Sequence, residues 1–175
     1  MDKPDIETIY SADEIKQRIT ELAAEIAQAK FEDLVVVPIL KGSFIFAADL
    51  IRGLYEAGVS PEIDFLSLAS YRGTESTGKV EILRDISAVV ENRDILLIDD
   101  ILESGHTLAF AKDLIAARGA NRVCTCVLLE KPARRVVDVE ADFLAYHCPD
   151  VFVVGYGMDL DHRFRELPFV GRIVQ

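Results

Sequence analysis

Two adjacent carboxylates and a turn of small residues carry the clearest chemical signal in this chain. Asp99 and Asp100 end an apolar run, and Ser104, Gly105 and Thr107 follow within seven residues of Asp100. If a helix begins after this turn, its first amides are unpaired and its positive end faces the turn. Glycine lets the backbone approach an anion closely, and the hydroxyls add donors. These residues therefore predict a phosphate-binding site, although the chain has no Walker A pattern.

The two carboxylates would repel a phosphate, so we expect them to have a different ligand. Sugar hydroxyls suit them, as does a Mg²⁺ ion that bridges to a second phosphate. A phosphate-binding turn beside hydroxyl-binding acids is typical of a site for a ribose 5-phosphate. The alternative for the S-G-H-T stretch alone is an ordinary polar turn that caps a helix.

Alternating helices and strands would have to bring these residues to one edge of a sheet. Ser11 and Glu14 form a capping box at the start of a helix predicted over 12–29. Further helices are predicted over 43–57 and 107–118. Apolar runs predict strands over 33–40, 63–68, 94–100, 122–129, 143–146 and 151–154. This order favours an α/β fold with a mostly parallel sheet, whose ligands bind beyond the carboxyl ends of the strands.

Two lysine motifs are predicted to lie at that same edge. Lys41-Gly42 follows the strand predicted over 33–40, and Lys131-Pro132 follows the strand over 122–129. The stretch 70–79, SYRGTESTGK, has too little apolar surface to pack and is predicted to be a mobile loop.

Composition limits the classes of protein that need considering. The 175 residues include 19 Lys and Arg against 30 Asp and Glu, a net charge of −11, and half of them are apolar. The apolar content excludes a disordered chain, and the length predicts a single domain over 1–175. The acidic charge argues against nucleic-acid and membrane partners. The sequence shows no stretch that resembles a signal peptide or a membrane span, and its three cysteines form no C-x-x-C pattern. We therefore expect a cytoplasmic protein whose cysteines are reduced.

Several motifs resemble known enzymes. The segment ILLIDDILESGHTL, residues 95–108, resembles the phosphoribosyl-pyrophosphate motif of the type I phosphoribosyltransferases. Other stretches over 37–172 resemble the hypoxanthine-guanine phosphoribosyltransferases: VPILKGS from Val37, Ser70-Tyr71 with Ser76-Thr-Gly78, Lys131-Pro132, and VFVVGYGMD from Val151 with Phe164-Arg165. The resemblance implies the type I fold, with a mostly parallel central sheet flanked by helices. It also implies a small hood built from the N- and C-terminal segments.

The resemblance further implies a reaction in purine salvage. The 5-phosphoribosyl group of phosphoribosyl pyrophosphate would pass to N9 of a 6-oxopurine, hypoxanthine and/or guanine, with Mg²⁺ as cofactor. The products would be a nucleoside monophosphate (IMP or GMP) and pyrophosphate. Members of the family are commonly oligomers, which predicts a homodimer or homotetramer.

Site residues are carried over by position from the same resemblance. The 5′-phosphate would be bound by Glu103, Ser104, Gly105, His106 and Thr107, and the ribose by Asp99 and Asp100. Pyrophosphate would be bound by Lys41, Gly42 and Arg165, in a loop whose leading peptide bond can be cis. The purine would be bound by Lys131, Phe152, Val153 and Asp159. Mg²⁺ would be held by Asp159, with Asp99 and Asp100 as the weaker candidates. The closing loop would include Ser70 and Tyr71, and the catalytic residues would be Glu103, Lys131 and Arg165.

The sequence departs from the family at two carboxylates. Glu103 stands where the general base is usually Asp, and Asp99 stands where the first ribose acid is commonly Glu. An added CH₂ moves a carboxylate by roughly one bond length, and a misplacement near 1 Å costs on the order of 100-fold in rate unless another rotamer compensates. We still expect Glu103 to be the base.

Two other functions are compatible with parts of the pattern. A non-catalytic regulator on the same fold would sense a nucleotide and bind RNA, for which the acidic charge is unsuited. A phosphoacceptor receiver domain also places acids at a strand end, but it has no phosphate-binding turn. Within the enzyme hypothesis, Lys131 and the main chain at Val153 suit any 6-oxopurine, so hypoxanthine, guanine and xanthine all stay open.

Overall fold

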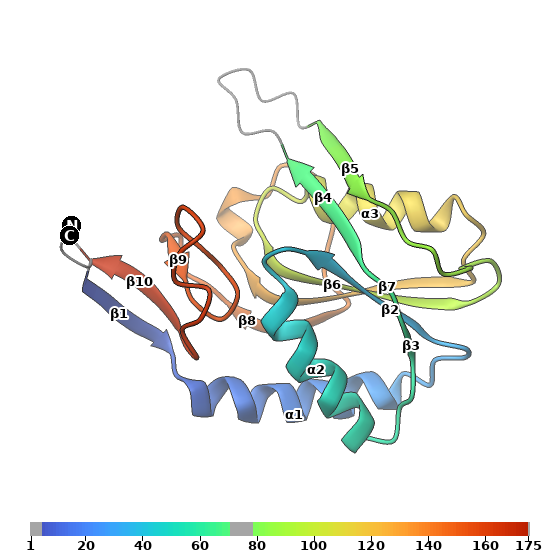
Figure 1. The fold of residues 1–175 in the computed structure, drawn as a ribbon, viewed down its shortest axis with the longest axis horizontal. Coiled ribbons are helices and arrows are strands. Elements are labelled where there is room, and N and C mark those ends of the chain that lie inside the picture. The colour runs from blue at the N-terminus through green and yellow to red at the C-terminus, as the bar shows by residue number, and fades with distance from the viewer. Residues whose placement is uncertain (1–4, 71–78, 175) are drawn as a thin grey trace.

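A central sheet organises the chain in this computed structural model, which describes residues 5–70 and 79–174. The seven-stranded sheet has the order β5-β4-β2-β6-β7-β8, with β3 beside β2 (Figure 1). β2, β3, β4, β6, β7 and β8 pair in parallel, and β5 is antiparallel to β4. The strands are β2 (Val35–Leu40), β3 (Glu62–Ile63), β4 (Leu66–Ser70), β5 (Val80–Arg84), β6 (Asp94–Leu102), β7 (Arg122–Glu130) and β8 (Phe143–His147).

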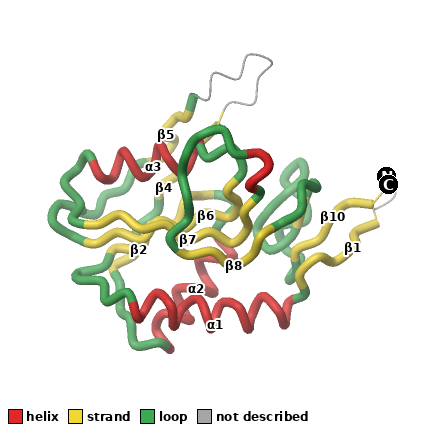
Figure 2. Tube along the Cα trace, turned by 180° about the vertical axis from the view of Figure 1, so that it is seen from behind, coloured by secondary structure: helices red, strands yellow, loops and turns green. Residues whose placement is uncertain are grey.

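Helices cover both faces of this sheet, as Figures 1 and 2 show from opposite sides. α1 (Ala12–Gln28) and α2 (Phe44–Glu56) pack on one face, and α3 (His106–Ala116) packs on the other. Residues 95–98 of β6 are all apolar because both faces of the strand are covered: Leu96 and Ile98 face α1 and α2, while Ile95 and Leu97 face α3. The predicted mostly parallel α/β architecture is therefore confirmed.

A second, three-stranded sheet forms a hood beside the main one. Its order is β1-β10-β9, all antiparallel, with β1 (Asp5–Tyr10), β10 (Val170–Val174) and β9 (Val153–Val154). Asp5 and Val174, which lie near the two ends of the chain, pair with each other in this hood. The strand expected over 151–154 is shorter than predicted and belongs to this hood, because its hydrogen-bonding partner is β10.

Most helix boundaries agree with the sequence within one or two residues. Ser11 accepts from the amide of Glu14, and the Glu14 side chain accepts from the Ser11 amide, so the capping box is confirmed. Beyond α3, Gly119 adopts a left-handed φ of +83°, a conformation that glycine allows just after the end of a helix. The strand predicted over 63–68 is wrong as one element: buried Asp64 interrupts it, because its carboxylate accepts from the amides of Phe65, Ser87 and Ala88.

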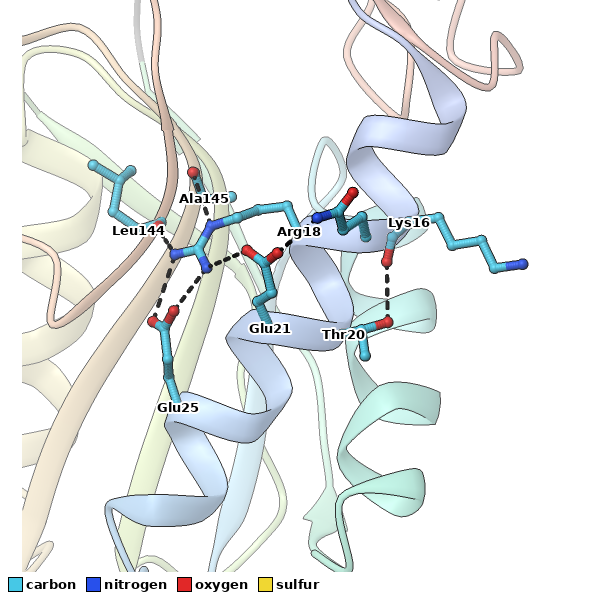
Figure 3. Close-up of polar contacts among 8 residues, drawn as sticks. Lys16, Arg18, Thr20, Glu21, Glu25, Leu144 and Ala145 are labelled. Atoms are coloured by element: carbon cyan, nitrogen blue, oxygen red, sulfur yellow. Dashed lines mark hydrogen bonds and ion pairs between the residues drawn. The ribbon is translucent and has the colours of Figure 1, made fainter.

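α1 is fixed to the outer strand β8 by one arginine (Figure 3). Arg18 donates to the carbonyl oxygens of Leu144 at 2.8 Å and Ala145 at 3.1 Å. Glu25 holds the same guanidinium at 2.7 Å, and Glu21 lies at 3.4 Å. These contacts satisfy backbone groups of an edge strand that would otherwise be open to pairing with another chain.

No helix within the described ranges is long and apolar enough to cross a membrane.

Replacing Arg18 by Met should lower the free energy of unfolding by about 1–3 kcal/mol, because two charge-assisted hydrogen bonds to β8 are lost. For a chain of this length, this corresponds to a fall in Tm of roughly 3–10 °C. Arg52→Met is the matched control, since Arg52 is 72% exposed and pairs only with Asp49 on its own helix. Calorimetry that gives both variants the wild-type Tm would contradict the assigned role of Arg18.

Candidate active site

Two loops approach each other and the carboxyl end of β6 so closely that each of them requires a glycine. A Cβ on Gly42 would overlap the Asp100 carboxylate, and a Cβ on Gly157 would overlap the carbonyl oxygen of Gly42. Lys41 is exposed and follows a cis peptide bond from Leu40, as the resemblance implies. The predicted pyrophosphate loop therefore lies directly against the predicted ribose acids.

Asp99, which is buried, and Asp100, which is partly buried, form an acid pair near the end of β6. The amide of Asp100 donates to Asp99 Oδ1 at 3.0 Å, and the amide of Ile101 donates to Asp100 Oδ1 at 2.9 Å. Burial, and then the negative charge of Asp100, raise the pKa of Asp99 well above its usual range. Burial also raises the pKa of Asp100, although the positive charge of Arg165 opposes the rise. Since neither acid has an ion-pair partner among residues 5–70 and 79–174, the pair is suited to receive hydroxyl donors or a cation.

The 103–107 turn has the geometry expected of an anion site. It connects β6, which ends at Leu102, to α3, which begins at His106. Gly105 has a φ of +90°, and a Cβ there would come within 2.7 Å of Val139 Cγ1. Gly105, the N-cap residue, has no side chain to cap α3, and the Ser104 hydroxyl accepts from the His106 amide at a long 3.5 Å. Because the first amides of a helix lack backbone partners, this turn is suited to bind an anion.

Glu103 and Lys131 lie side by side at the ends of the adjacent strands β6 and β7. Lys131 Nζ is 2.7 Å from Glu103 Oε1, and the side chains are 3% and 27% exposed. The amide of Lys131 also donates to the carbonyl oxygen of Leu102 at 2.9 Å, which ties the two strand ends together. The predicted base and the predicted purine-binding lysine are therefore brought together as a donor–acceptor pair.

Asp159 and Arg165 form a second ion pair near the glycine contact. Arg165 Nη2 is 2.8 Å from Asp159 Oδ1, and Arg165 Nη1 donates to the Gly157 carbonyl oxygen at 2.6 Å. The other oxygen of Asp159 accepts from the amide of His162 at 2.8 Å. Arg165 thus reaches the loop that packs on Gly42, on the same side of the site as the predicted pyrophosphate loop.

The remaining predicted residues lie in or near the hood and the closing loop. Val153 is buried in β9, and Phe152, one residue earlier, is 51% exposed, so its ring surface is open to stacking. Ser70 ends β4, while Tyr71 and the rest of 71–78 lie outside the described residues.

The donor set fits Mg²⁺ at the acid pair better than at Asp159. No group of three or more His, Cys, Asp or Glu able to hold a metal occurs in the described part of the chain. Mg²⁺ needs no such cluster, since it commonly takes one or two carboxylates together with waters and substrate phosphates. Asp99 and Asp100 offer adjacent oxygens without a cationic partner, whereas Asp159 is already held by Arg165.

Comparison with known proteins matches this arrangement to one family. A model of the phosphoribosyl transferase domain matches residues 5–161. The chain belongs to the phosphoribosyl transferase family. The hypoxanthine phosphoribosyltransferase of Escherichia coli strain K12 is 39% identical over 98% of this chain and 97% of its own length. The hypoxanthine-guanine phosphoribosyltransferase of Bacillus subtilis strain 168 is 41% identical over 98% of this chain and 95% of its own.

Solved structures agree on the fold of this phosphoribosyl transferase. A crystal structure of a hypoxanthine-guanine phosphoribosyltransferase from Bacillus anthracis superimposes with a TM-score of 0.91 at 39% identity, covering 98% of this chain and 100% of that one. The predicted type I fold is thereby confirmed and the receiver-domain hypothesis is wrong. These relatives carry enzyme names, and nothing in the comparison supports the RNA-binding regulator.

Two residues of the site were missed by the sequence analysis. Gly157 is required by its contact with Gly42, and its G-Y-G context is a signal that could have been read as a tight turn. Arg135 donates to the carbonyl oxygen of Glu103 at 3.1 Å. Nothing in the sequence distinguishes Arg135 from its neighbour Arg134, because both are charged residues in a loop-like stretch.

The acid pair predicts how stability depends on pH. A carboxyl group whose pKa is raised in the folded protein stabilises it at pH values below the unfolded pKa of about 3.9, and the contribution is lost as pH rises. Asp99→Asn removes the buried charge and keeps the acceptor oxygen for the Asp100 amide. We therefore expect the variant to have a higher Tm than the wild type at about pH 8, with the difference shrinking toward about pH 4.

Thermal scans at both pH values test this expectation. Asp138→Asn is the control, because Asp138 is exposed, and its Tm should follow the wild type at every pH. A lower Tm for Asp99→Asn than for the wild type at about pH 8 would contradict the prediction, because it would show that the protein stabilises the buried charge of Asp99.

Proposed function

We propose that this chain transfers the 5-phosphoribosyl group from phosphoribosyl pyrophosphate to N9 of a 6-oxopurine in purine salvage. The names of its relatives support this activity. The observation that carries it in the structure is the pair of Lys131 and Glu103, 2.7 Å apart beside the 103–107 turn.

The pair matches one edge of a 6-oxopurine. N7 and O6 are neighbours on that edge, and both lie away from N9. The Lys131 ammonium group donates to O6, and the Glu103 carboxylate accepts the hydrogen on N7. An adenine would present an amino group to Lys131 in place of the oxygen, and two donors would then face each other. The same pair serves hypoxanthine, guanine and xanthine.

The reaction follows from this placement. N9 attacks C1′ of the sugar, the bond from C1′ to the pyrophosphate oxygen breaks, and the N7 proton passes to Glu103. Lys41 and Arg165 stabilise the charge that develops on the departing pyrophosphate. The 103–107 turn holds the 5′-phosphate, and Asp99 and Asp100 orient the ribose hydroxyls. Mg²⁺, when bound at the acid pair, supplies additional positive charge to the leaving group.

Other parts of the proposal rest on the family and on placement. In this proposal Phe152 stacks on the base, the backbone of Val153 contacts the edge of the base, and Asp159 is a further purine-binding residue. The closing role expected of Ser70 and Tyr71 stays a prediction from the sequence, because residues 71–78 lie outside the described ranges. The enzyme is a cytoplasmic homodimer or homotetramer. Sedimentation that gives a monomer at assay concentration would contradict the oligomer.

Turnover with purified protein is the direct test of the proposed function. The protein is mixed with Mg²⁺, phosphoribosyl pyrophosphate and hypoxanthine, guanine, xanthine or adenine, and nucleotide formation is followed by chromatography. We expect IMP or GMP with equimolar pyrophosphate, and a kcat/KM for adenine lower by about 10⁴-fold or more. Absence of product with all three 6-oxopurines would refute the proposal.

Glu103 variants test the assignment of the base. Glu103→Gln keeps the size of the side chain but cannot take the proton, so kcat should fall by about 10²- to 10⁴-fold. Glu103→Asp keeps the carboxylate at a shorter reach and should retain more activity than Glu103→Gln. Full turnover by Glu103→Gln would show that another group accepts the N7 proton.

A further inference from the structure

Arg135 lies behind the 103–107 turn and holds three oxygens from three parts of the chain. Its Nε donates to the carbonyl oxygen of Glu103 at 3.1 Å, and its Nη1 donates to the carbonyl oxygen of Val139. Its Nη2 is 2.8 Å from Glu130 Oε1. The side chain is 17% exposed, so these contacts replace most of its hydration.

The chain around Arg135 holds the next carbonyl group of the turn as well. The amides of Val136 and Val137 both donate to the carbonyl oxygen of Ser104 at 2.9 Å. The carbonyl groups of Glu103 and Ser104 therefore both point toward residues 135–137. Neither contact involves an atom that would touch a ligand, so segment 135–137 supports the turn from behind.

Because each peptide unit is planar, fixing the direction of its carbonyl group also fixes the direction of the following amide. In a trans peptide unit the carbonyl and the following N–H point in opposite directions. With the Glu103 and Ser104 carbonyl groups fixed toward Arg135 and its neighbours, the amides of Ser104 and Gly105 point the other way. Within the described residues these two amides have no hydrogen-bond partner. They are therefore free to donate to the phosphate proposed for this turn.

Glu130 keeps the guanidinium in place. It ends β7, one residue before Lys131, and its second oxygen is 3.2 Å from His147 Nδ1. The guanidinium plane reaches three acceptors in fixed directions, which the single ammonium group of a lysine cannot reproduce. Arg135 and Lys131 thus hold the backbone and the side chain of Glu103 from the same segment.

We propose that Arg135 is a positioning residue that aims the amides of Ser104 and Gly105 at the 5′-phosphate. The inference rests on the proposed function of the same site, and Arg135 itself touches no substrate. Its loss lets the peptide units at 103–105 rotate, so the phosphate loses oriented donors while the purine contacts at Lys131 remain.

The test compares Arg135→Ala with Arg134→Ala in steady-state kinetics. Arg134 is the matched control, because it is the adjacent arginine, is 52% exposed, and pairs with Asp150 at the surface. For Arg135→Ala we expect the KM for phosphoribosyl pyrophosphate to rise by about 10- to 100-fold, as for a lost charge-assisted hydrogen bond. The KM for hypoxanthine should change by less than about threefold, and Arg134→Ala should leave both constants near wild type.

Chemical rescue separates orientation from general stability. Guanidinium at concentrations that do not lower Tm should restore part of the affinity of Arg135→Ala for phosphoribosyl pyrophosphate, and urea at the same concentration should not. If Arg135→Ala does not fold, Arg135→Lys provides the same comparison of the two KM values, without the rescue. Equal changes in both KM values, or values like those of Arg134→Ala, would overturn the role of Arg135. Lack of turnover by the wild type would instead refute the proposed function.

Discussion

The site depends on the close approach of two loops to the carboxyl end of β6. Gly42 follows β2, Asp100 lies within β6 and Gly157 follows β9, and no larger side chain fits at either glycine. Parallel strands make this possible, since their carboxyl ends lie at one edge of the sheet. Lys41, Arg165 and the acid pair are consequently gathered in one place although they are far apart in the sequence. Rigid packing at the glycines fixes this geometry before any substrate arrives.

The acid pair of Asp99 and Asp100 has no ion-pair partner within the described residues. Asp99 is buried and Asp100 is partly buried, and burial raises the pKa of both carboxyl groups. Two nearby cationic side chains pair with other acids, Arg165 with Asp159 and Lys131 with Glu103. Hydroxyl donors or a cation would offset the cost of such an acid pair, and local costs of this kind are common at functional sites.

Patterns of local origin could be predicted from the sequence, and features set by distant contacts could not. The capping box at Ser11 and the apolar run 95–98 of β6 are patterns among residues close together in the sequence. The sequence therefore predicts α1 and this buried strand correctly. The turn at Gly105 also has a local signal. By contrast, β1 and β10 are short and half-exposed, and they form strands only because they pair with each other. Asp64 interrupts a predicted strand because its carboxylate accepts from the amides of residues 87 and 88. Arg135 likewise contacts the carbonyl oxygen of Glu103, which is distant in the sequence.

The hood imposes an order on how the protein can be assembled during synthesis. β1 comprises residues 5–10, but among the described residues it pairs with β10 alone, residues 170–174, and β9 joins the same sheet through β10. On the ribosome, the first strand can therefore pair only after nearly the whole chain has emerged, whereas the large sheet needs no residue beyond β8. A translation product interrupted before residue 170 could contain the 103–107 turn and still lack the three-stranded sheet. The hood is thus the last part of the fold to be completed.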